Sequence, residues 1–170
     1  MYLTLDSTVL RRLSRDDLIA FQAYRTDPNV AKYQSWQMMD DAETHSFLEH
    51  MATTTPLMRP GNWTQIAVAQ KDSDTLLGDM GLHLSADSEE AEIGITLATD
   101  SQGKGHATRA VEMATAWLFD TTPITRIHAW ADIRNVPSRR LLERAGFNQI
   151  RIEVTNGVTE AAFVMNRARS

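Results

Sequence analysis

The sequence contains no cysteine among its 170 residues, and this absence excludes several kinds of chemistry. Disulfides, thiolate nucleophiles and cysteine-based zinc sites are all removed from consideration. Long apolar runs are missing too, since none approaches the ~20 residues of a membrane span. The first residues lack the order of basic charge, apolar block and small-residue cleavage site that marks a signal peptide. We therefore expect a cytoplasmic protein with no membrane partner.

Basic residues are in the minority: 17 Lys and Arg against 22 Asp and Glu give a net charge of −5. Nucleic-acid binding draws most of its affinity from a basic face, so we expect no nucleic-acid partner. An acidic balance suits a positively charged substrate better, although acidity also serves solubility alone. No linker or repeat divides the chain, and its 42% hydrophobic content predicts one domain over residues 1–170.

Hydrophobic periodicity and turn residues predict the order strand, two helices, three strands, helix, strand, helix, two strands. The clearest strand covers residues 91–98, where Ala91, Ile93, Ile95 and Leu97 alternate with polar or small residues. Apolar residues at helical spacing follow a short turn. The whole order is that of a mixed α+β domain with about seven strands and four helices.

The turn between that strand and that helix is DSQGKGHAT, residues 100–108, in which two glycines flank Lys104. Free N–H groups and the dipole at a helix start favour a bound phosphate. A nucleotide P-loop needs a glycine where Ala98 stands, and the dinucleotide fingerprint needs one where Thr108 stands. Neither pattern fits, and an ordinary tight connection between strand and helix stays open.

The spacing Gln102-x-x-Gly105-x-Ala107 resembles the coenzyme A pyrophosphate loop of the GNAT superfamily of N-acetyltransferases. Its small residues leave room for the pyrophosphate to approach the backbone. A second stretch, DIRNVPSRRLLERAGF, resembles the later motif of the same family, in which Asn135 and Ser138 precede a helix that ends in Gly-Phe.

The opening of the chain is similar to the RimJ/RimL-like branch, which acetylates the N-termini of ribosomal proteins. The resemblance covers residues 8–164 and implies the GNAT fold, a mixed sheet whose central strands, here residues 91–98 and 124–132, splay apart. It also implies acetyl-CoA as cosubstrate, with its pantetheine arm in the gap, and no metal. The family often pairs through its last strands, so a homodimer is compatible with the resemblance.

By resemblance, one set of residues contacts the cofactor: Leu97, Ala98, Thr99, Gln102, Gly103, Lys104, Gly105, His106, Ala107, Thr108 and Asn135. The N–H of Leu97 is expected on the thioester carbonyl, where it would stabilise negative charge. Asn135 also has a purely structural alternative, as a helix cap.

Transfer to an amine requires a base for the ammonium proton and an acid for the leaving thiolate. Glu92, on the polar face of its strand, is the candidate base acting through water, or else a solvated or salt-bridged carboxylate. Ser138 matches the serine that RimL-like enzymes use toward the thiolate, or else only bonds to backbone at its helix start. Leu142 occupies the position of the tyrosine acid of many members, so Ser138, water or positioning alone must substitute.

We expect an acetyl-CoA-dependent N-acetyltransferase acting on a primary amine, either a protein N-terminus or a small cationic amine such as an aminoglycoside or polyamine. An α-amine, with a pKa of ~7.7–8.0, needs less help from a base than a lysine at ~10.4. Tyr33 and Trp36 are candidates to line the acceptor cleft, with ordinary packing as the alternative. A non-catalytic acyl-CoA-binding regulatory module, favoured by Leu142, and an interaction domain without cofactor remain competing hypotheses.

Overall fold

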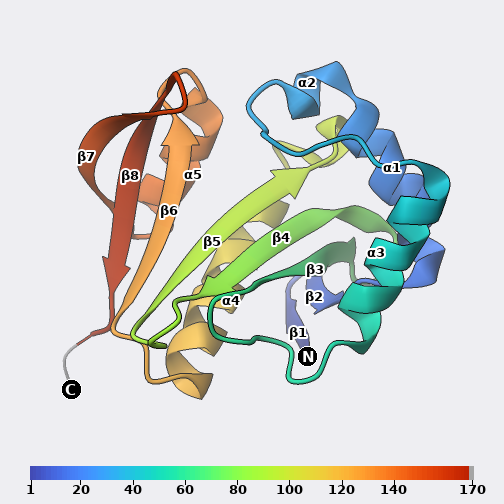
Figure 1. Cartoon of the computed structure of the whole chain (residues 1–170), viewed down its shortest axis with the longest axis horizontal. Helices are drawn as coiled ribbons and strands as arrows, with labels where there is room; N and C mark the ends of the chain where they lie inside the picture. The colour runs from blue at the N-terminus through green and yellow to red at the C-terminus, as the bar shows by residue number, and fades with distance from the viewer. Residues whose placement is uncertain (169–170) are drawn as a thin grey trace.

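The computed structural model describes residues 1–168, which contain one mixed sheet of eight strands in the order β1-β2-β3-β4-β5-β6-β8-β7 (Figure 1). The strands are β1 Tyr2–Leu5, β2 Thr8–Arg12, β3 Trp63–Gln70, β4 Leu76–Leu84, β5 Glu90–Leu97, β6 Arg126–Asp132, β7 Asn148–Thr155 and β8 Val158–Asn166. The helices are α1 Leu18–Thr26, α2 Pro28–Ala31, α3 Asp41–Thr53, α4 His106–Thr121 and α5 Val136–Arg144. This is the expected α+β arrangement.

The sequence pattern does not predict two of these elements, β1 and α2. β1 is a four-residue edge strand paired with β2, and the turn between them places Asp6 at a φ of 49°. So short a strand shows too little alternation to be recognised. α2 is a single turn that begins at Pro28, and the Asp27 side chain caps it. Proline interrupts the preceding helix, but its fixed φ suits the first position of a new one.

The centre of the sheet is its only parallel pair within residues 1–168, β5 and β6, and this pair is joined for a short distance only. Residues 90–92 pair with residues 126–128, and beyond them the two strands diverge (Figure 1). The expected splay of the central strands is confirmed. Backbone groups of the second half of β5 therefore face a gap instead of a neighbouring strand.

Helices cover both faces of the sheet. Ile66 and Val68 of β3 belong to the larger core, which includes Val111 and Leu118 of α4, whereas Ala67 belongs to the core with α1 and α3. The side chains of β3 divide in this way because successive residues of a strand point to opposite faces. α4 lies behind the splayed strands and closes the gap on that side (Figure 1).

Candidate active site

The glycine turn after β5 has the backbone conformation that only glycine adopts readily. Gly103 and Gly105 have φ of 74° and 81°, and Gly105 is the N-cap of α4. A Cβ atom on Gly105 would lie 2.7 Å from Nη1 of Arg109, whereas one on Gly103 would meet nothing within 4 Å. The N–H of Arg109 bonds to the carbonyl of Gly105 at 3.1 Å, and the helical residues before it have no helical carbonyl within reach. The turn therefore has the backbone geometry of an anion-binding site.

The end of β5 presents a backbone donor to the gap. The N–H of Ala98 bonds to the carbonyl of Leu77 on β4 at 2.8 Å. Successive N–H groups of a strand point to opposite neighbours, so that of Leu97 points toward the gap left by β6. The carbonyl of Leu97 on the same side accepts a bond of 3.1 Å from Nε2 of Gln102. Gln102 thus replaces the missing strand partner and ties the turn to β5.

His106 of the turn and Thr99 just before it have side chains that bond to other parts of the chain. The buried imidazole of His106 has its Nδ1 at 2.8 Å from the hydroxyl of Thr8, and its pKa is lowered, first by burial and then by Arg109 and Lys104. The hydroxyl of Thr99 donates to Asp27 at 2.6 Å. These two side chains hold the turn against β2 and against Asp27, the N-cap of α2.

A groove of about 600 Å³ runs along the turn, and we call it the loop groove. One wall is the turn and the start of α4, and the other is α5, including Arg140 and Arg144. Of the residues expected at the cofactor, the following line it: Leu97, Gln102, Gly103, Gly105, His106, Ala107, Thr108 and Asn135. Ala98, Thr99 and Lys104 are outside its lining within the described chain.

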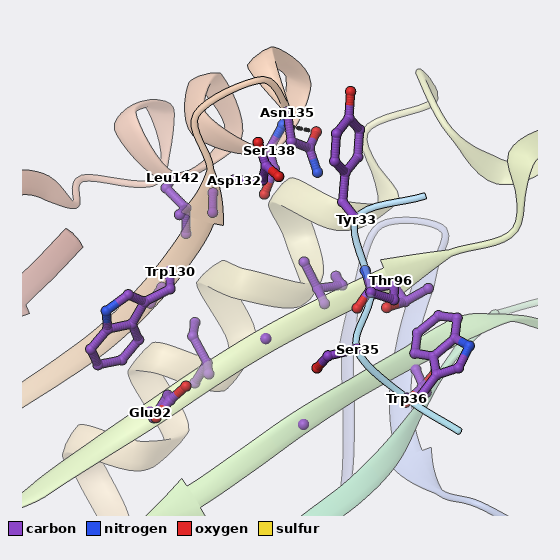
Figure 2. Close-up of a pocket in the computed structure, with 18 of the residues that line it drawn as sticks. Tyr33, Ser35, Trp36, Glu92, Thr96, Trp130, Asp132, Asn135, Ser138 and Leu142 are labelled. Carbon is purple, nitrogen blue, oxygen red and sulfur yellow. Dashed lines mark hydrogen bonds between the residues drawn. The ribbon is translucent and has the colours of Figure 1, made fainter. Parts of the chain in front are cut away.

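A second cavity, of about 390 Å³, opens between β5, β6 and the loop after α2, and we call it the Glu92 cavity (Figure 2). Tyr33 and Trp36 line it, as does Glu92. Tyr33, Thr96 and Ser138 line both the cavity and the loop groove, so the two spaces meet beside the splayed end of β5. A ligand in the groove can therefore reach a ligand in the cavity.

The Glu92 carboxyl is half-buried in the wall of this cavity. Burial, and then repulsion from Glu160, raise its pKa from 4.5 to about 7. A carboxyl with such a pKa takes up and releases a proton readily at neutral pH.

Other carboxylates around the cavity are matched by cations. Arg134 bonds to Asp132 at 2.6 Å and lowers the pKa of that carboxyl to about 2. Arg25 bonds to the buried Asp79 at 3.2 Å. Glu160, by contrast, has no ion pair within residues 1–168, and its pKa is raised by burial and then by Asp132 and Glu153. The cavity therefore carries two unmatched carboxyl groups, Glu92 and Glu160.

Aromatic rings form much of the cavity wall. Three of the four tryptophans line it, Trp36, Trp63 and Trp130. Each has a second group against its ring: the Arg25 guanidinium at 4.5 Å, the His83 ring at 5.2 Å and the His128 ring at 5.6 Å, respectively. Rings fixed in this way are rigid surfaces for a ligand.

The start of α5 closes the site from above (Figure 2). The Asn135 side chain caps the helix by accepting the N–H of Ser138 at 3.2 Å, so its expected structural use is present. Both residues line the groove and the cavity. Leu142 is buried in the cavity wall, so that position supplies no acid.

Sequence reasoning missed Glu160, Trp63, Trp130, Arg140 and Arg144, whose positions depend on which strands and helices meet. Residues 1–168 contain no group of three or more His, Cys, Asp or Glu side chains placed to hold a metal ion. In the same residues, every helix is too short or too polar to cross a membrane.

Comparison with known proteins gives consistent results. Residues 8–148 match the model of the acetyltransferase (GNAT) domain. An uncharacterised N-acetyltransferase p20 of Bacillus licheniformis is 27% identical over 141 residues, which are 82% of this chain and 78% of that one.

Solved structures share the fold. An acetyltransferase of the GNAT family from Bacillus anthracis superposes with a TM-score of 0.84 at 19% identity and covers 98% of both chains. A ribosomal-protein-S5-alanine acetyltransferase from Vibrio fischeri gives 0.82 at 16% identity and covers 98% of this chain and 96% of its own. With its family match over most of its length, the chain belongs to the GNAT acetyltransferases, which use acetyl-CoA.

Proposed function

We propose that this chain moves the acetyl group of acetyl-CoA directly to a primary amine, with the cofactor in the loop groove and the amine in the Glu92 cavity. The observation that carries the proposal is the junction of these two spaces, one of which has in its wall a carboxyl whose pKa is about 7. Two reactants held at such a junction gain most of the benefit of an intramolecular reaction.

The groove fits acetyl-CoA, which supplies an activated thioester carbonyl. The open space at Gly103 and the N–H groups at the start of α4 match a pyrophosphate. Lys104 of the turn, with Arg140 and Arg144 on the opposite wall of the groove, adds positive charge for the phosphates. The free N–H of Leu97 is suited to the pantetheine arm or to the thioester oxygen. Asn135 is free to use its amide N–H₂ here, since only its oxygen caps α5.

In this proposal Glu92 accepts the proton of the incoming ammonium group, directly or through one water. Ser138, at the junction of groove and cavity, is placed to protonate the departing thiolate, and no bond of its hydroxyl to another described residue competes. Leu142 contributes only an apolar wall.

The acceptor that fits best is a small cationic amine. Glu92 and Glu160 have no cation of their own in the described residues, and the tryptophan walls suit a cation or an apolar body. The cavity's volume of about 390 Å³ is that of a small-molecule site. The second candidate is a protein N-terminus, as in the RimJ/RimL-like branch, and it is favoured by the likeness to the ribosomal-protein acetyltransferase.

The test is release of free thiol from acetyl-CoA against a panel of polyamines, aminoglycosides and short peptides, with mass spectrometry of the product. We expect oligocationic amines to be acetylated with a lower KM than the peptides. The substitution Glu160→Gln should raise the KM for oligocationic amines and leave the KM for a singly charged amine nearly unchanged. Acetyl-CoA binding with no thiol release for any amine would instead support a non-catalytic module.

A further inference from the structure

One cross-strand row of the sheet leaves an open floor in the Glu92 cavity. Gln65 of β3 pairs with Gly81 of β4, which pairs with Gly94 of β5, and all three line the cavity. Paired residues of adjacent strands point to the same face, so two glycines without side chains lie beside the Gln65 side chain. A Cβ atom on Gly94 would meet nothing within 4 Å. We call the open floor over Gly81 and Gly94 the glycine trough.

The Gln65 side chain ends above Gly81. A Cβ atom on Gly81 would lie 2.7 Å from Oε1 of Gln65 and 3.0 Å from the nearest atom of the Trp63 ring. The amide and the ring therefore occupy the space that a side chain at this position would take. Gln65 thus reaches from β3 over β4. Since neighbouring strands lie ~4.8 Å apart, its amide oxygen is about one strand spacing from β5, the strand of Glu92.

That amide oxygen has no hydrogen-bond partner. Oε1 of Gln65 is buried, and nothing among residues 1–168 donates to it. Outside the strand ladder, the backbone N–H of Gln65 bonds to Sδ of Met51 at 3.2 Å, which leaves the side chain free. A buried polar atom without a partner costs free energy and calls for an explanation. Because this side chain lines a cavity, a ligand can supply the missing partner.

The charges around the cavity decide which ligand group fits beside this amide. The two unmatched carboxyl groups belong to other strands, Glu92 to β5 and Glu160 to β8, which lies beyond β6 in the sheet. On β4, over which the Gln65 amide lies, Asp79 is matched by Arg25 at 3.2 Å. A second ammonium group of the acceptor therefore belongs near Glu92 and Glu160, and an uncharged polar group belongs beside Gln65.

We propose that the Gln65 amide binds a hydroxyl group of the acceptor, an inference that rests on the proposed function. A hydroxyl both donates and accepts, so it pairs with either atom of the amide, whereas an ammonium group only donates. The acceptor is then a hydroxylated amine that lies across the glycine trough with its reactive nitrogen toward Glu92. Gln65 determines specificity and takes no part in proton transfer.

The test measures thiol release with three amines of equal length that differ only at the far end: n-pentylamine, its ω-hydroxy derivative and its ω-amino derivative. We expect the parent to prefer the ω-hydroxy derivative over n-pentylamine in kcat/KM by about fivefold to tenfold, the contribution of one hydrogen bond. Gln65→Met keeps the length of the side chain and removes the amide. In this variant the ratio should fall to about one, with the KM for acetyl-CoA retained.

Three further variants separate the parts of the inference. Gln70→Met changes the same residue type on the same strand outside the cavity lining of the described chain, and it should keep the preference. Gly94→Ala places a methyl group in the trough without a clash, so the KM for the ω-hydroxy derivative should rise about tenfold. Glu160→Gln should weaken the use of the ω-amino derivative and leave the preference for the hydroxyl unchanged.

Several results would overturn the inference. Equal use of n-pentylamine and its ω-hydroxy derivative by a parent that acetylates both would refute it and leave the proposed function intact. A preference that survives in Gln65→Met, or an unchanged KM in Gly94→Ala, would refute it as well.

Binding to the parent decides the matter even if no amine releases thiol, in which case the proposed function fails separately. In nitrogen-15 spectra of the parent with bound CoA, the side-chain amide signals of Gln65 should shift more with the ω-hydroxy derivative than with n-pentylamine. Signals that stay in place with both amines would contradict the inference.

Discussion

The substitution Glu92→Gln removes the charge and keeps the shape of the side chain. Because the pKa of Glu92 is raised to about 7, about a tenth of the parent is ionised at this position at pH 6 and about nine tenths at pH 8. If the ionised form is the base, the ratio of parent to variant kcat/KM should rise about tenfold over that interval and reach 10²–10⁴, roughly, at its plateau. Taking the ratio removes the titration of the acceptor amine itself.

The free energy of unfolding of the same variant shows whether burial and Glu160 raise the pKa of the Glu92 carboxyl. The pKa is higher in the folded chain than the value of 4.5 that applies when the chain is unfolded. Ionisation of this group therefore lowers the free energy of unfolding. The loss is absent below pH 4.5, grows between pH 4.5 and 7, and is complete above pH 7. Glutamine is neutral throughout, so at pH 8 we expect Glu92→Gln to be more stable by on the order of 2 kcal/mol, after allowance for partial exposure.

Urea unfolding at pH 4 and pH 8 measures this difference, and thiol release from pH 6 to 9 measures the rate ratio. A stability gain at pH 8 that disappears at pH 4 places the carboxyl as described. A rate ratio that stays flat across pH, in a variant with that stability gain, would refute the assignment of Glu92 as the base.

Three further substitutions test neighbouring features. Glu160→Gln removes one cause of the raised pKa of Glu92, so the midpoint of the pH–rate profile should move to lower pH, and an unmoved midpoint would exclude the coupling. Asn135→Ala removes the α5 cap and should lower the free energy of unfolding by about 1 kcal/mol. Weaker acetyl-CoA binding by this variant in calorimetry would show that Asn135 also contacts the cofactor. Gly78→Ala places a Cβ atom 2.0 Å from the carbonyl oxygen of Thr96, so thermal unfolding should show a loss of roughly 1–3 kcal/mol, and a neutral result would mean that β4 and β5 separate easily.

Local patterns were enough to predict most of the fold. The helix start at Asp40, the strand over residues 91–98 and the cap at Asn135 follow from residue types within a few positions of one another, and the structure has all three elements within a residue or two. β1 and α2 were not predicted because each is only four residues long. So short an element carries almost no periodic signal.

The candidate site likewise has features that the sequence predicts and features that it does not. The glycine turn is predictable because positive φ at two positions requires glycine. Glu92 follows from alternation along one strand, but its raised pKa depends on Glu160, which lies 68 positions later in the chain and reaches it only through the register of β5, β6 and β8. The position of Gln65 beside Gly81 and Gly94 depends in the same way on the register of β3, β4 and β5. Such contacts are set by tertiary pairing and leave no local pattern.

Two of the residues expected at the cofactor have side chains that bond to other parts of the chain. The family resemblance places His106 and Thr99 on the cofactor, whereas their side chains bond to Thr8 and Asp27. Since those bonds position the backbone of the turn, substitutions there test the shape of the loop and not a direct contact.

The central claim is that the turn at Gly105 holds acetyl-CoA, and calorimetric titration of the parent and of Gly105→Val with acetyl-CoA tests it most directly. Valine is strained at a φ of 81°, and its Cβ would meet Arg109 at 2.7 Å, within the anion site. We predict saturable one-to-one binding by the parent and its loss in a variant that circular dichroism shows to be folded. Absence of binding by the parent, or equal affinity of the folded variant, would contradict the account.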